Sequence, residues 1–135
     1  MKKILLLFIM ILSTCLYSQD GFQYVTTSKD GTDYYYQISS DIDSNMGLYT
    51  DIWLKYNTQN KKVKAKSGKY ITKKGNSILS LMRISCFNKS FIIKNSFQYS
   101  NKGSLIKKDE PFMTEQPIPP GSVIDNIYQV VCRKE

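Results

Sequence analysis

Residues 77–99 read SILSLMRISCFNKSFIIKNSFQY. Two runs within this stretch, Ser77 to Phe87 and Ser90 to Tyr99, are rich in apolar residues and flank the polar dipeptide Asn88-Lys89. Two such runs with a short polar connection are typical of a β-hairpin. The stretch therefore predicts two neighbouring antiparallel strands, and the rest of the chain can be placed around them.

Further strands are predicted before and after this hairpin. Asp30-Gly31 and Asn101-Lys102-Gly103 have the composition of turns, and the stretch from Asp41 to Gly47 has that of a loop. Four strand-like segments lie between these breaks: Phe22 to Thr27, Thr32 to Ile38, Leu48 to Tyr56 and Ser104 to Lys107. Together with the hairpin they predict an antiparallel meander of about six strands.

The end of the chain changes from strand to helix periodicity. Ser122 and Asp125 form a capping box, in which the serine side chain accepts a hydrogen bond from the backbone N–H three residues on. The residues before it are ones that interrupt ladders and helices: Pro117, Pro119, Pro120 and Gly121. Apolar residues then recur at helical spacing: Val123, Ile124, Ile127, Tyr128, Val131 and Cys132. We predict an amphipathic helix from Ser122 to Arg133 packed on the sheet, which makes the fold α+β.

The first residues have the pattern of a secretory signal peptide. Lys2 and Lys3 precede an unbroken apolar run from Ile4 to Leu12, and small and polar residues follow as far as Ser18. Nine apolar residues are too few to cross a hydrocarbon core of about 30 Å. We expect residues 1–18 to be the signal peptide and residues 19–135 to form a single exported domain.

Cys15 offers a second way of processing the same segment. The sequence Leu12-Ser13-Thr14-Cys15 resembles a bacterial lipobox, in which the cysteine is acylated and anchors the mature protein to a membrane. Cleavage after Ser18 would instead release a domain without a lipid. Both alternatives place the protein outside the cytoplasm, in the periplasm, at the cell surface or in the medium. Only acylation of Cys15 gives it a membrane contact.

Export determines how the remaining cysteines are interpreted. Cys86 and Cys132 are the two that remain in the mature domain. Two cysteines in an oxidising compartment predict one disulfide, which would contribute on the order of 4 kcal/mol of stability. The alternative is a pair of free thiols. No basic residue adjoins Cys86 in the segment Ile84-Ser85-Cys86-Phe87, so nothing there indicates an activated thiolate.

Charge is distributed unevenly along the mature chain. Residues 19–51 carry six acids and one lysine, and residues 109–135 carry five acids and two basic residues. Residues 52–108 carry fourteen lysines and arginines and no acid. Such a separation produces either one positive face, which attracts anionic partners, or pairs of acidic and basic strands. The sequence leaves both interpretations open.

The lysines in the middle of the chain are the candidate binding residues. Seven of them fall within fourteen positions: Lys61, Lys62, Lys64, Lys66, Lys69, Lys73 and Lys74. In an extended segment Lys62, Lys64 and Lys66 would lie on one side over about 13 Å. A series of this kind suits sulfated or carboxylated glycans, lipid phosphates or an acidic protein surface. It is also typical of an edge strand or solvated loop whose lysines prevent edge-to-edge pairing. We take Lys61, Lys62, Lys64, Lys66 and Lys69 as candidate ligand contacts.

A group of tyrosines is the second feature of this kind. Its members are Tyr34, Tyr35, Tyr36, Tyr49 and Tyr56. Cross-strand packing explains such clustering on a pleated sheet, and an aromatic recognition patch is the alternative.

The composition argues against catalysis. The chain contains no histidine, which excludes imidazole metal sites and histidine-based triads. We find no nucleophile paired with a base, no glycine-rich phosphate loop after a strand and no paired CxxC motif. We therefore expect a protein that is not an enzyme and has no cofactor or metal. Export also argues against a nucleic-acid partner for the basic segment.

Several of these features together resemble the surface-adhesin protein E family of bacteria. The resemblance rests on Trp53, Cys86, the hairpin Tyr99 to Gly103, the segment Pro119 to Val123 and the final Val131-Cys132. It extends from about Phe22 to the end of the chain. It implies a small exported protein with an antiparallel sheet and a C-terminal helix. It also implies a binding role, since some members contact host matrix or plasma proteins.

Residues and resemblance together predict an exported binding module. Its expected partners are anionic glycans or host and matrix proteins, contacted through the lysine-rich segment. The alternative is a structural or assembly component of the cell envelope that has no external ligand. The sequence does not define an oligomeric state.

Overall fold

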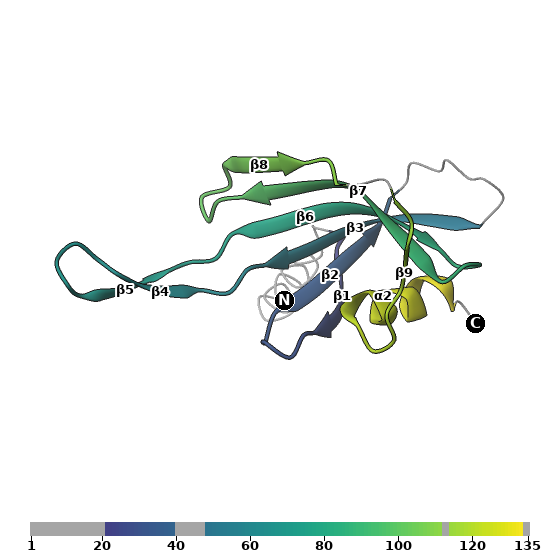
Figure 1. Ribbon diagram of the computed structural model, residues 1–135, viewed down its shortest axis with the longest axis horizontal. Coiled ribbons are helices and arrows are strands. Elements are labelled where there is room, and N and C mark those ends of the chain that lie inside the picture. Colours follow the sequence, from purple (N-terminus) through teal and green to yellow (C-terminus); the bar gives the residue numbers. More distant parts are fainter. Residues whose placement is uncertain (1–20, 40–47, 112–113, 134–135) are drawn as a thin grey trace, which may run out of the picture.

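The computed structural model describes residues 21–39, 48–111 and 114–133. The predicted signal peptide, Cys15 and the predicted loop at Asp41 to Gly47 lie outside these ranges. Within them the chain forms an antiparallel sheet, a separate small hairpin and one helix (Figure 1). The fold is therefore α+β, as predicted.

The main sheet is a meander with one interruption. Its strands are β1 (Gln23–Thr27), β2 (Asp33–Ile38), β3 (Tyr49–Asn57), β6 (Ser77–Ser85), β7 (Ser90–Tyr99) and β8 (Leu105–Asp109). They pair in the order β1-β2-β3-β6-β7-β8, each antiparallel to its neighbour. These are the six strands that the sequence predicts, with ends that shift by one or two residues.

Two elements were not predicted. The hairpin of β4 (Lys61–Lys64) and β5 (Tyr70–Lys73) lies between β3 and β6 and forms a two-stranded sheet of its own. The short strand β9 (Gln116–Pro117) pairs with the start of β7, so that Pro117 stands opposite Ser90. The expectation that Pro117 interrupts every ladder was therefore wrong, because proline is compatible with a short strand at a sheet edge.

The core lies between one face of the sheet and the helix α2 (Val123–Cys132). Ile52 on β3 stands opposite Met82 on β6, and both side chains are completely or almost completely buried. Ile127 and Val131 are the buried residues of α2. Burying aliphatic side chains of this size stabilises a fold by about 1.5–3 kcal/mol each. Figure 1 shows α2 lying alongside β1 and β9.

The helix begins where the capping box predicts. The Ser122 hydroxyl accepts a hydrogen bond from the backbone N–H of Asp125 at 3.1 Å. The carboxylate of Asp125 accepts one from the backbone N–H of Gly121 at 2.9 Å. Two N–H groups at the helix start are thereby satisfied, which is worth about 1 kcal/mol for a typical cap.

A disulfide joins the helix to the turn between β6 and β7. Cys86 and Cys132 are bonded, with 5.4 Å between their Cα atoms. The Tyr128 hydroxyl donates to the carbonyl oxygen of Cys86 at 3.2 Å. Lys89, which has a φ of 50°, places its Nζ 3.1 Å from the Asp125 carboxylate. The predicted disulfide is thus confirmed, and the turn is held to the helix at three points.

Candidate functional site

The lysine-rich segment forms an arm that extends beyond the main sheet. Figure 1 shows β4 and β5 running outward from the ends of β3 and β6, away from α2. The two strands join through a tight turn, in which the N–H of Ala65 donates to the carbonyl oxygen of Lys69 at 2.8 Å. All residues of both strands are exposed. We call residues 61–74 the basic arm.

Strand pairing determines which face of the basic arm each lysine occupies. Lys62 and Lys64 stand opposite Thr72 and Tyr70, and these four residues share one face. Lys61 stands opposite Lys73 on the other face, beside the pair Val63 and Ile71.

Two of the candidate residues lie in the turn. The expected alignment of Lys62, Lys64 and Lys66 holds for the first two, because they are alternate residues of β4. Lys66 follows the end of the strand and lies in the turn, as Lys69 does at its other end. The structure therefore brings all five candidate residues together on one arm, but it spreads them over two faces and a turn.

The positive charge of the basic arm is not neutralised within the described residues. Ion pairs there involve Arg83, Lys89, Lys94, Lys107 and Lys108, none of which belongs to the arm. Like charges that stand opposite each other on paired strands are destabilising, as for Lys61 and Lys73. The arm thus keeps a net charge of +7 from its seven lysines, because residues 61–74 contain no acid.

In the main sheet, unlike the basic arm, basic side chains form ion pairs with an acidic one. Arg83 Nε and Lys94 Nζ each lie 2.7 Å from a carboxylate oxygen of Asp51. Burial raises the pKa of Asp51, but the hydrogen bonds and the charges of Arg83 and Lys94 outweigh it and hold that pKa below its usual value. Acidic and basic side chains therefore pair with each other in the main sheet, whereas the basic arm keeps an unneutralised positive charge. Each interpretation of the charge pattern describes one part of the molecule.

The base of the basic arm is fixed by a compact set of hydrogen bonds. The N–H of Thr58 donates to the carbonyl oxygen of Asn76, and the N–H of Asn76 donates to the Thr58 hydroxyl, both at 2.8 Å. The N–H of Gly75 donates to the side-chain oxygen of Asn60 at 3.0 Å. These contacts close the arm directly beyond the last pair of β3 and β6, Asn57 with Ser77.

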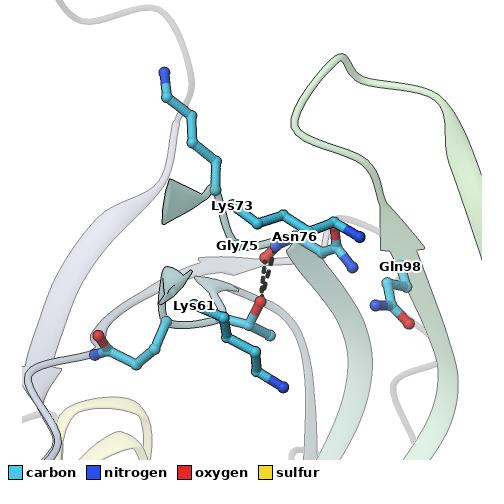
Figure 2. Close-up of a pocket in the computed structure, with 8 residues that line it drawn as sticks. Lys61, Lys73, Gly75, Asn76 and Gln98 are labelled. Atoms are coloured by element: carbon cyan, nitrogen blue, oxygen red, sulfur yellow. Dashed lines mark hydrogen bonds between the residues drawn. The ribbon is translucent and has the colours of Figure 1, made fainter. Parts of the chain in front are cut away.

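A polar hollow of about 250 Å³ lies at this base. Its lining includes Lys61, Lys73 and Lys74 from the basic arm and Gln98 from β7, and we call it the lysine pocket. Figure 2 shows Lys73 extending away from Gly75 and Asn76, whereas Gln98 belongs to a neighbouring strand. Figure 2 shows Lys61 and Lys73 extending to different sides, so a bound carboxylate or sulfate would contact only part of the donors that the three lysines and the Gln98 carboxamide supply.

Lys73 and Lys74 belong to the lysine cluster seen in the sequence, but they were not among the predicted contacts. Their position in the pocket depends on the return strand β5 and on Gln98, which is 24 residues further along the chain than Lys74. The hairpin was not predicted, although the alternation of Val63 with Lys62 and Lys64 and the turn dipeptide Ser67-Gly68 are local signals that could have indicated it.

The tyrosine cluster has a structural role. The rings of Tyr34 and Tyr56, which stand opposite each other on β2 and β3, have centroids 4.9 Å apart. Tyr36 is buried and its hydroxyl donates to the side-chain oxygen of Gln23 at 2.9 Å. Cross-strand packing, the first of the two interpretations, therefore accounts for these three residues.

The described residues include no group of three or more Asp, Glu or Cys side chains placed to hold a metal ion. Over the same ranges, no helix has both the length and the apolar character needed to cross a membrane.

Fold and site define a class of protein, a small disulfide-linked α+β domain that presents a basic arm. The chain belongs to the surface-adhesin protein E family, whose family model matches residues 22–133. The match covers the sheet, the basic arm and the helix, and it confirms the resemblance seen in the sequence. No curated protein and no solved structure gave a significant match. Membership of this family indicates a surface adhesin, a binding protein at the cell surface or exported from the cell.

Proposed function

We propose that the protein is an exported, non-enzymatic adhesin module that binds anionic glycans through the basic arm. The single observation that carries the proposal is a projecting hairpin with seven exposed lysines and no acid. The contacts would be the ammonium groups of the five candidate residues, Lys61, Lys62, Lys64, Lys66 and Lys69. Family membership supports the adhesin part of the proposal, and the arm supports the anionic partner.

The geometry of the basic arm suits a repeating polyanion better than a single anion. Lys62 and Lys64 are two residues apart on one face, a spacing of about 7 Å along a strand. Each exposed charge contributes only about 0.2–1 kcal/mol to an ion pair. Several such contacts along one glycan chain add up, and the field of the whole arm raises the association rate. Sulfated or carboxylated polysaccharides carry charges in such a series.

An acidic surface on a host or matrix protein is the second candidate partner. Exposed apolar side chains next to the lysines favour it, because a protein surface offers them larger apolar contacts than a polyanionic glycan does. Tyr70 and Ile71 have 73% and 53% of their surface exposed, and they lie on opposite faces of the arm. Binding to such a protein would bury the one on the contacting face, and it would depend less on salt than glycan binding does.

Glycan binding can be tested with three substitutions in the basic arm. The triple variant K62Q/K64Q/K66Q should bind heparin about tenfold more weakly than the unmodified domain, since the loss of three exposed contacts amounts to about 1.4 kcal/mol. The control K102Q/K107Q/K108Q removes the same charge from exposed positions outside the arm. This control should change the affinity for heparin by less than about twofold. Raising the salt from 0.1 to 1 M should abolish heparin binding by the control and by the unmodified domain.

The same preparations test the interpretation that the lysines only protect a sheet edge. If they do, K62Q/K64Q/K66Q should keep its affinity for heparin and gain a tendency to self-associate, measured by light scattering. That result would contradict the proposed function.

The structural alternative, an envelope component with no external ligand, is tested on intact cells. An adhesin has to be accessible from outside, so protease treatment of intact cells should remove the basic arm, where exposed lysines supply cleavage sites. Complete protection of the protein in intact cells, with cleavage after lysis, would support the structural role.

A further inference from the structure

An apolar groove lies beside the start of the helix. It has a volume of about 300 Å³. The sheet contributes Tyr34, Leu54, Tyr56, Met82 and Ile93 to its lining, and the helix contributes Val123 and Ile124. A cavity of about 150 Å³ is large enough for benzene, so this groove has room for a short acyl chain. Leu54 and Met82 are buried at its floor, whereas Tyr34 and Tyr56 are only partly covered.

The groove and the lysine pocket are neighbours on the same face of the molecule. Tyr56 lines the groove, and Thr58, two residues further along the chain, lines the lysine pocket. Alternate residues of an extended strand point to the same side and are about 7 Å apart. Strand pairing also places the two hollows side by side. Ile78 on β6 stands opposite Tyr56 on β3, which lines the groove, and opposite Gln98 on β7, which lines the lysine pocket.

The two hollows differ in chemistry in a complementary way. The groove is lined mainly by aliphatic and aromatic side chains, together with Ser80 and Ser122, whereas the lining of the other hollow includes Lys61, Lys73 and Lys74. A ligand that fills both needs an apolar tail and a negative head within roughly 10 Å of each other, given the strand spacing. Single-chain anionic amphiphiles, such as fatty acids and alkyl sulfates, have this construction.

We propose that the groove and the lysine pocket together bind one single-chain anionic amphiphile. Its acyl tail lies in the groove between β3 and α2, and its carboxylate or sulfate contacts the lysines at the base of the basic arm. Each methylene buried in the groove raises the affinity about fourfold, so that tail length dominates the affinity and the lysines select the charged head. This site shares Lys61 with the proposed glycan contacts, but Lys62, Lys64 and Lys66 lie further along the arm and do not line it, so the two kinds of binding can be separated.

The test uses decanoate and its neutral counterpart decanol, each titrated into the exported domain below micelle-forming concentrations. Calorimetry should show saturable binding of one decanoate per domain and at least fivefold weaker binding of decanol. The variant K73Q/K74Q should bind decanoate at least fivefold more weakly and leave decanol unaffected. The control K107Q/K108Q, which removes the same charge from β8, should bind both as the unmodified domain does.

The location of the tail is tested separately. V123F places a larger side chain at the mouth of the groove and should abolish binding of both probes while circular dichroism stays unchanged. Ring signals of Tyr34 and Tyr56 in the unmodified domain, followed by NMR, should shift on addition of decanoate. This second measurement does not depend on whether V123F folds.

Three results would overturn the proposal: no saturable binding of decanoate, equal loss of decanoate and decanol on K73Q/K74Q, or binding that leaves both tyrosine signals in place. Inorganic sulfate alone should not compete at equal concentration, and full competition by it would mean that only a bare anion site exists. Loss of heparin binding in K62Q/K64Q/K66Q with decanoate binding retained separates this site from the proposed function.

Discussion

The backbone of Gly75 passes so close to Thr58 that a Cβ atom at Gly75 would lie 1.6 Å from the Thr58 carbonyl oxygen. No side chain fits at that distance. The close approach allows the hydrogen bonds between Thr58 and Asn76 and between Gly75 and Asn60, on which the base of the basic arm depends. The orientation of the arm relative to the main sheet therefore depends on a glycine at this position.

The substitution Gly75→Ala should displace the basic arm. Relieving the contact requires the two chains to separate, so we expect a loss of more than about 2 kcal/mol, as for other backbone incompatibilities. Gly68→Ala is the matched control, because Gly68 has a φ of 81° but nothing within 4 Å of an added Cβ. It should cost only about 1 kcal/mol. Urea unfolding of both variants measures the difference, and equal losses would contradict this explanation.

The substitution Cys132→Ser should destabilise the domain by about 2–5 kcal/mol, because it opens a disulfide whose cysteines are 46 residues apart in the sequence. The helix should loosen from the β6–β7 turn, and amide exchange in residues 123–132 should rise. Peptide mapping of the exported protein under non-reducing conditions should recover the Cys86–Cys132 crosslink. Recovery of both thiols in free form would show that the bond does not form after export.

The substitution Asp51→Asn should cost about 1–3 kcal/mol at pH 7, because it leaves Arg83 and Lys94 close together without the carboxylate that lies between them. The folded-state pKa of Asp51 lies below the unfolded value of about 3.9, so its contribution is complete above that value and is lost as the pH falls through the folded pKa. Chemical unfolding between pH 7 and pH 2 should therefore show a flatter acid limb for D51N. The control D109N removes an exposed partner of Lys107 and should cost less than about 0.5 kcal/mol.

Local patterns were sufficient to predict most of the fold. The paired runs in residues 77–99 form β6 and β7, and the Ser122–Asp125 capping box starts the helix where expected. Each of these features depends on contacts between residues close in the sequence. The disulfide could be predicted as well, because the expected removal or acylation of Cys15 leaves Cys86 a single partner.

The β4–β5 hairpin and β9 were not predicted, for physical reasons. Val63 and Ile71 form a single apolar pair in the arm, and so short an alternation among many lysines is as typical of a solvated loop as of a strand. The lysine pocket requires Gln98 to lie beside the base of the arm, which follows from the order of β3, β6 and β7 in the sheet. Contacts of this kind depend on tertiary pairing, which no short stretch of sequence contains.

NMR mapping of the unmodified domain would show directly whether the basic arm contacts an anionic glycan. A heparin-derived oligosaccharide titrated at 0.1 M salt should shift the backbone amides of residues 61–74, and the shifts should disappear at 1 M salt. Lys107 and Lys108, which already have acidic partners, provide the internal reference and should move little. Shifts centred on β8, or no shifts in the arm at saturating oligosaccharide, would show that the basic arm is not the surface that binds the glycan.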